Sequence, residues 1–378
     1  MSEYQYYEFV AIDEPLTDAQ QDELRAVSTR GQISPTSFVN EYEWGDLKAD
    51  PRVWMERHFD AHLYLANWGT RRIALRLPLA MLDPATADRY CLGGPAQAWT
   101  TSTHVILDFH SGDEEGIEDW IDPQGRLAAI APVRTELAQG DLRSLYLAWL
   151  LVVQDRELEA KGLEPPVPPG LGRLSGAQRA LADFLRLDPD LLAAAATESE
   201  PLTTRTPAVS TLKAWVKGLP DADKDALLLR VLQGEGALLR SEMLRRLHGR
   251  SGLPTAGNRT IGELLTGGEK ARARRQEAAK RRDATERLRR EEAAAAARNE
   301  RLDLLARDPE SAWEQVIALI ETKRAREYDA ATALLDELRT LAERSDDLAA
   351  FAERMMVLRT RNARKPSLMD RFDRAELP

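Results

Sequence analysis

The sequence is poor in the residue types that build metal sites and covalent cross-links. It has one cysteine, Cys91, and five histidines in 378 residues. A single cysteine excludes an internal disulfide and any zinc site that depends on cysteine ligands. No glycine-rich phosphate loop follows any of the expected strands, which disfavours nucleotide binding. We therefore expect no cofactor.

Long apolar runs are also lacking. The most apolar run, 145–153, is far shorter than the ~20 residues that a helix needs to cross a bilayer. The first residues, MSEYQYYE, are acidic and aromatic, unlike a secretory signal peptide. We therefore expect a cytoplasmic protein that does not bind membranes.

Net positive charge is absent as well. The chain carries a formal net charge of −10. This balance argues against non-specific nucleic-acid binding by the whole molecule, but it leaves room for a local basic surface.

The first 160 residues alternate between strand and helix patterns. The run YQYYEFVAI and the flanks of Asn67-Trp68-Gly69-Thr70 are rich in β-branched and aromatic residues, which favours strands. A capping box at Thr17–Gln20 and Asp-Pro pairs start short helices between them. The segment 127–159 changes to a helical period. These patterns predict an α+β domain with strands over 4–12, 36–44, 62–77 (as a hairpin) and 100–110.

The remainder of the chain is predicted to be mostly α-helical. Glu164-Pro-Pro-Val-Pro-Pro-Gly170 is typical of a stiff linker. Gly267-Gly268 is a turn signal, and the Ala-, Arg- and Glu-rich stretch after it favours one long charged helix. Three helices with one-sided apolar spacing and a last short helix over 367–375 follow. The predicted divisions are 1–160, a linker at 161–172, a helical domain at 173–266, a long charged helix at 267–307, and a C-terminal helical interaction module at 308–378.

The long helix carries a dense run of basic residues. Such a run can meet phosphates or an acidic partner, but Glu–Arg pairs four residues apart can equally stitch a solvated helix. No aromatic residue interleaves the run for base stacking. The candidate contact residues are Arg272, Arg274, Arg275, Lys280, Arg281, Arg282, Arg287, Arg289 and Arg290.

Histidines offer two further candidate sites. His58 and His62 are spaced as metal ligands on one helix would be, although hydrogen-bonded histidines at a helix–strand junction fit the pattern better. Asp108 and His110 share a strand face and could form a carboxylate–imidazole pair for a hydrolase. Ser102 and Ser111 are the nearest hydroxyls, but neither follows a nucleophile-elbow pattern.

Two other groups are open to a functional or a structural interpretation. The acidic stretch from Asp113 to Asp122 could hold a cation through its carboxylates, but a solvated loop is the simpler interpretation. Tryptophans at expected loop and strand ends could anchor an interface or belong to the core. They are Trp44, Trp68, Trp99 and Trp120.

The C-terminal fifth resembles the helical tail of bacterial SWIM-type zinc-finger proteins. The matching features are Lys323 with Tyr328-Asp329, Leu335 with Leu338-Arg339, and Arg364-Lys365-Pro366-Ser367-Leu368. The family's zinc motif requires Cys-x-Cys and Cys-x-His, which are missing here, so the resemblance implies a helical interaction module without the metal. The opening YQYYEFVAIDEPLT resembles uncharacterised bacterial proteins.

Together these patterns favour a non-enzymatic cytoplasmic adaptor whose partner is another protein, in a complex that handles nucleic acid. The first alternative is an accessory factor that binds nucleic acid through the basic helix at 270–290. The second is a hydrolase that uses Asp108 and His110. The sequence leaves the oligomeric state open.

Overall fold

The computed structural model describes residues 4–112, 122–156, 158–202, 209–232, 239, 242–243, 246–247 and 257–378. The chain divides into two compact units, Met1–Arg275 and Gln276–Pro378, and the division falls inside one helix. Within the described residues, no helix is long and apolar enough to span a membrane.

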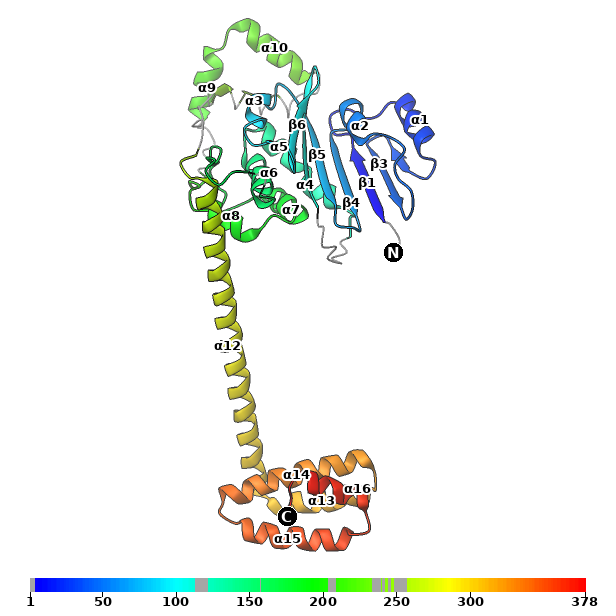
Figure 1. Cartoon of the computed structure of the whole chain (residues 1–378), viewed down its shortest axis with the longest axis vertical. Coiled ribbons are helices and arrows are strands. Elements are labelled where there is room, and N and C mark those ends of the chain that lie inside the picture. Colours follow the sequence, from blue (N-terminus) through cyan, green and yellow to red (C-terminus); the bar gives the residue numbers. More distant parts are fainter. Residues whose placement is uncertain are drawn as a thin grey trace. The chain divides into compact units, whose positions relative to one another are not determined.

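Unit 1 is built on a seven-stranded sheet in which every pairing is antiparallel, so the predicted α+β class is confirmed (Figure 1). The strand order is β2-β3-β1-β4-β5-β7-β6. The strands are β1 Gln5–Val10, β2 Gln32–Ser34, β3 Ser37–Tyr42, β4 Ala61–Ala66, β5 Arg71–Pro78, β6 Ala96–Thr100 and β7 His104–Ser111.

Most helices of unit 1 pack on one or the other face of this sheet. Leu63, Leu75 and Leu107 lie on one face, in a core that also holds side chains of α4 to α8. Phe9 and Phe38 lie on the other, beneath α1 and α2. Alternating side-chain direction along each strand separates these two cores. The helices are α1 Asp18–Val27, α2 Pro51–Arg57, α3 Pro84–Ala87, α4 Arg126–Ile130, α5 Pro132–Ala138, α6 Arg143–Gln154, α7 Gly176–Phe184, α8 Pro189–Ala196, α9 Val209–Gly218 and α10 Asp221–Leu232.

Several local predictions are confirmed and one is wrong. The Thr17–Gln20 capping box opens α1, and β4 and β5 form the predicted hairpin. The segment 100–110 is not one strand, because β6 ends at Thr100 and β7 begins at His104. Two strands meet here at a tight turn, in which the Thr101 backbone N–H donates to the His104 carbonyl over 2.8 Å.

The proline-rich segment predicted as a linker is packed into unit 1. Glu164 is 1% exposed, and the Tyr90 hydroxyl donates to the Pro166 carbonyl over 2.8 Å. The core beneath the sheet continues without a break from residues before this segment to Leu191 and Leu264 after it. The segment therefore does not separate two hydrophobic cores.

The long helix α12, Ile261–Arg307, begins earlier than the sequence indicated and runs through Gly267 and Gly268. A Cβ on Gly267 would lie 3.1 Å from the Ala194 Cβ, and one on Gly268 would lie 3.4 Å from the Leu191 Cα. These glycines are therefore not a turn. They allow α12 to approach the backbone of α8 closely.

Unit 2 has its own hydrophobic core. Trp313, Leu335, Phe351 and Phe372 come from four successive helices and pack together. The predicted last short helix is thus part of the same core as the three before it. These helices are α13 Pro309–Glu321, α14 Ala325–Arg344, α15 Leu348–Asn362 and α16 Pro366–Arg374.

Candidate functional site

Two basic residues of the predicted contact run, Arg272 and Arg275, serve the fold of unit 1. Arg275 makes two hydrogen bonds to the Asp190 carboxylate, of 2.9 and 2.7 Å, and the Arg272 Nη2 lies 2.5 Å from the Asp188 Oδ2. Asp188 caps the N-terminus of α8. The hydrogen bond from Arg275 lowers the pKa of Asp190. Both arginines therefore hold α12 against α8.

Three more arginines pair with glutamates one helical turn away. Arg281 lies 3.0 Å from Glu277 and Arg287 lies 2.8 Å from Glu291, while Arg290 pairs with Glu286. All these side chains are more than half exposed, so each pair adds little stability. The pairs do reduce the net charge that α12 presents.

The other four residues of the run remain on the surface. Every residue from 272 to 301 is exposed, so in the described part of the chain this stretch of α12 buries no side chain against another element. In the described part of the chain, no carboxylate forms an ion pair with the remaining four. They are Arg274, Lys280, Arg282 and Arg289.

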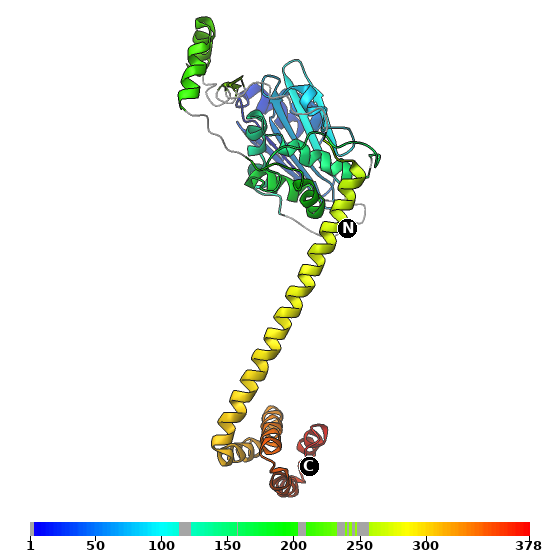
Figure 2. The ribbon, with the colours of Figure 1, turned by 90° about the vertical axis from the view of Figure 1, so that its left-hand side faces the viewer.

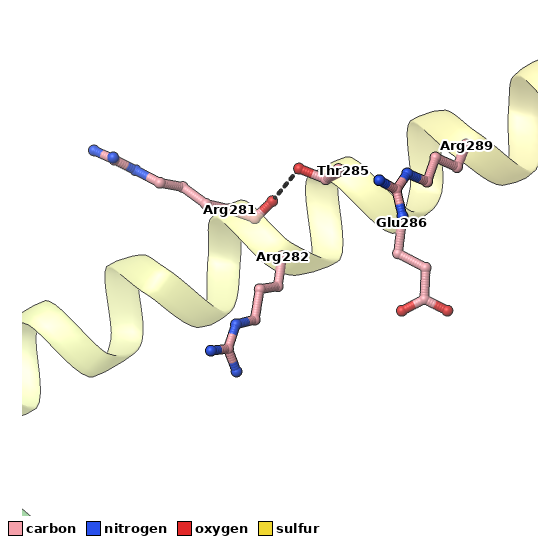
Figure 3. A pocket seen from close by; sticks show the side chains of 5 residues that line it. All are labelled: Arg281, Arg282, Thr285, Glu286 and Arg289. Atoms are coloured by element: carbon pink, nitrogen blue, oxygen red, sulfur yellow. Dashed lines mark hydrogen bonds between the residues drawn. The ribbon is translucent and has the colours of Figure 1, made fainter.

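The hollow drawn in Figure 3 lies on this exposed stretch. Arg281, Arg282, Thr285, Glu286 and Arg289 line it, and all five come from α12. The Thr285 hydroxyl donates back to the Arg281 carbonyl over 2.8 Å. One helix cannot enclose a small ligand. This stretch is suited to contact with an extended, negatively charged surface.

The candidate catalytic pair is not formed. Asp108 is 1% exposed, and both of its oxygens accept hydrogen bonds from the Arg72 guanidinium, one at 2.7 Å. In the described part of the chain, His110 makes no hydrogen bond to Asp108. Ser111 points to the opposite face of the sheet from both, because side chains alternate along a strand. The Asp108 carboxylate therefore neutralises Arg72.

The two histidines considered as metal ligands do not share a helix. His58 is the C-cap residue of α2, whereas His62 lies in β4. The His62 ring stacks on Phe9 at 3.9 Å between centroids, and its Nδ1 lies 3.0 Å from the Glu8 carbonyl. Among the residues that the structure describes, no cluster of three or more histidine, cysteine or acidic side chains could hold a metal.

His62 is expected to make unit 1 sensitive to mild acid. Burial lowers its pKa to about 4 from the ordinary value of 6.5. The buried imidazole is neutral in the folded state, and the unfolded state binds a proton more readily because its pKa is higher. The contribution of neutral His62 to the free energy of unfolding is therefore complete above about pH 6.5 and is lost as the pH falls toward 4. Between pH 7 and pH 5 we expect a loss of about 2 kcal/mol. Urea unfolding at a series of pH values measures it.

A phenylalanine at this position keeps the stacked ring and removes the titration. His62→Phe is therefore expected to flatten the dependence of unfolding free energy on pH between 5 and 7. His104→Gln, on the same sheet face, serves as the control. Burial lowers the pKa of His104 too, but its side chain is only partly covered, so this variant should change the pH dependence less than His62→Phe. An unchanged pH slope in His62→Phe would contradict the assignment.

The acidic stretch and the four tryptophans considered in the sequence analysis have different outcomes. The acidic stretch from residue 113 to 121, with Trp120, lies outside the described residues. Trp44 is 79% exposed and Trp68 is 42% exposed. Trp99 is tied down, because its Nε1 donates to Glu56 over 2.8 Å and the Arg52 guanidinium lies 4.2 Å from its ring centroid.

Sequence reasoning missed a groove on unit 2. It lies between the end of α12, α13 and α14, and an Arg301–Glu337 ion pair of 2.6 Å closes one side. Leu304 is 56% exposed within it. The only early signal was the leucine cluster at 302–305, which is too short to indicate a coiled coil. The apolar side chains that line the groove are Leu304, Leu305, Ala312, Leu319, Ala330, Ala333 and Leu334.

Comparison of the chain with protein-family models, with curated proteins and with solved structures returned no match.

Proposed function

We propose that this chain is a non-enzymatic cytoplasmic adaptor that binds another protein through the groove of unit 2. The observation that carries the proposal is the exposed leucine in a groove that both apolar and polar side chains line. Such a groove suits an amphipathic helix, whose apolar face covers the apolar side chains while its polar side chains meet the polar ones. Arg301, Asp308 and Glu337 are the charged side chains of the lining.

The polar groups inside unit 1 are consistent with a binding role. Asp60, Asp108 and Glu164 are buried, and each is neutralised by an arginine. Burial raises the pKa of the Cys91 thiol to about 12, which keeps it protonated and unreactive. The resemblance of the tail to SWIM-type proteins supports, by analogy, a place in a complex that handles nucleic acid.

Affinity capture from the native cells tests the groove. The full chain is compared with Leu304→Glu/Ala333→Glu, and the lysate is treated with nuclease. A defined protein that survives nuclease and is lost with this variant supports the proposal. Met356→Glu/Val357→Glu is the matched control, because these side chains are exposed on α15 of the same unit. If both variants retain the partner, the contact lies outside the groove and the proposal is wrong.

The second candidate function is nucleic-acid binding through α12. Between residues 270 and 290 the sequence has ten basic and three acidic residues, and five of the basic side chains are exposed without an ion-pair partner in the described part. No base-stacking aromatic accompanies them. Binding of this kind would be electrostatic and independent of base sequence.

Opposite charge changes test this second function. Changing Arg274, Lys280, Arg282 and Arg289 to Gln is expected to weaken binding to single-stranded DNA or RNA. It should also lower the slope of log affinity against log salt by about three. Changing Glu277, Glu286 and Glu291 to Gln releases three arginines and is expected to strengthen binding. Equal affinities for the three proteins at low salt would remove nucleic acid as a ligand of α12.

A further inference from the structure

The helices α9 and α10 of unit 1 leave their apolar side chains uncovered. No side chain of α9 is buried, and in α10 only Leu227 is. Both helices lie clear of the sheet in Figure 2, where they are drawn in green. The exposed apolar side chains are Val209 (66%), Val216 (42%), Leu228 (62%), Leu229 (56%), Val231 (48%) and Leu232 (85%).

Such helices need a partner for their apolar faces. They have 10 and 12 residues, and isolated helices of this length are marginal in water. Neighbouring exposed apolar side chains on a folded protein mark an interaction surface more often than a free one. Arg230 of α10 forms an ion pair of 2.9 Å with Glu242, on a side of the helix away from Leu228.

The two helices carry opposite charges beside these apolar faces. On α9, Val209, Leu212 and Val216 share one face, and Lys213 and Lys217 flank it. On α10, helical spacing places Asp221 and Asp225 on the same face as Leu228 and Leu232. Asp221 pairs with Lys224 of its own helix over 2.9 Å, but the Asp221 side chain is 93% exposed and so can also meet a partner.

We propose that α9 and α10 pair with the same two helices of a second copy of this chain. The apolar faces meet, and Lys213 and Lys217 of each copy face Asp221 and Asp225 of the other. A two-fold axis places a surface against itself, so it requires a self-complementary patch, and this helix pair has one.

Other occupants match the surface less well. An anionic membrane would meet the exposed aspartates of α10 and be repelled by them. An acidic helix would suit the lysines of α9 but would face the same aspartates across the leucines of α10. A matching partner must place acidic side chains against the lysines of α9 and basic side chains against the aspartates of α10. A second copy of the same helix pair does both.

Sedimentation equilibrium of the full chain over a range of concentrations tests the proposal. The monomer mass is 42.3 kDa, and we expect twice that mass at high concentration. Leu228→Glu/Leu232→Glu is expected to raise the dissociation constant at least ~30-fold, which corresponds to ~2 kcal/mol for the two substitutions together. The control Met356→Glu/Val357→Glu, on unit 2, should leave it unchanged. A monomer at all concentrations, or a dimer that the α10 variant does not weaken, would overturn the proposal.

A charge exchange distinguishes pairing between copies from a general loss of fold. Lys213→Glu/Lys217→Glu and Asp221→Lys/Asp225→Lys are each expected to weaken self-association. An equimolar mixture of the two variants should restore the dimer, because opposite charges then face each other in both contacts. Failure of the mixture to associate, or loss of binding to anionic vesicles as the only effect of either variant, would contradict the proposed pairing.

Discussion

Changing Asp60 to Asn is expected to lower the free energy of unfolding of unit 1 by about 3–5 kcal/mol. Asp60 is fully buried between α2 and β4. Its Oδ1 accepts two hydrogen bonds from Arg76, of 3.1 and 2.9 Å, and lies 3.8 Å from the Arg134 Nη2. Its Oδ2 accepts from the backbone N–H groups of Ile12 and Asp13, at 2.7 and 2.9 Å.

The cost arises from the arginines that remain. The side chains of Arg76 and Arg134 are 12% and 7% exposed, so water cannot replace the lost carboxylate. Among the described residues, Asp13 would be the carboxylate left in ion-pair contact with Arg134. An uncompensated buried charge costs more than the intact pair contributes. The backbone bonds to residues 12 and 13 would also weaken, which loosens the chain after β1.

Urea unfolding followed by tryptophan fluorescence measures the change, because Trp54 and Trp149 are buried in unit 1. Asp22→Asn, an exposed change on α1, is the neutral control. Asp108→Asn should fall between the two, because the Arg72 side chain is 43% exposed and can be hydrated when its partner is removed. Equal stability of Asp60→Asn and Asp22→Asn would show that this cluster is not a structural centre.

The parts of the fold that the sequence predicted are those that local patterns determine. The β4–β5 hairpin depends on a short loop between two β-rich runs, and α1 depends on its capping box. The α+β class follows from such segments. The start of α12 was missed because Gly267 and Gly268 signal a turn when read alone. Only their contact with α8, more than 70 residues earlier, explains them.

The same distinction applies to the candidate sites. The sequence predicted a basic helix and its i, i+4 glutamate partners, which are local. It could not indicate that Arg272 and Arg275 are engaged by Asp188 and Asp190, because these lie 84 and 85 residues away. The sequence allowed a pair of Asp108 with His110 on the same strand, whereas the partner of Asp108 in the structure, Arg72, is on the neighbouring strand.

The burial of the proline-rich segment leads to the second large effect. Changing Glu164 to Ala is expected to destabilise unit 1 by about 3–5 kcal/mol. Glu164 Oε2 accepts hydrogen bonds from the Tyr146 hydroxyl and the Arg259 Nη2, both at 2.9 Å. The backbones of these segments are also joined, because the Glu164 N–H donates to the Arg259 carbonyl over 3.0 Å and the Gly257 N–H donates to the Glu164 carbonyl over 2.7 Å. Alanine would leave a nearly buried guanidinium and a buried hydroxyl without this acceptor.

Because Arg259 lies two residues before the start of α12, the loss should be greatest where that helix begins. Hydrogen exchange at 259–265 is expected to accelerate in Glu164→Ala more than exchange in the central strands. Gly257→Ala provides a variant that leaves the charges in place, because its Cβ would lie 2.4 Å from the Glu164 Cγ and displace that side chain. Gly172→Ala is its control, with nothing within 4 Å of the added Cβ. If Gly257→Ala and Gly172→Ala unfold alike, the Glu164 carboxylate does not fix the start of α12.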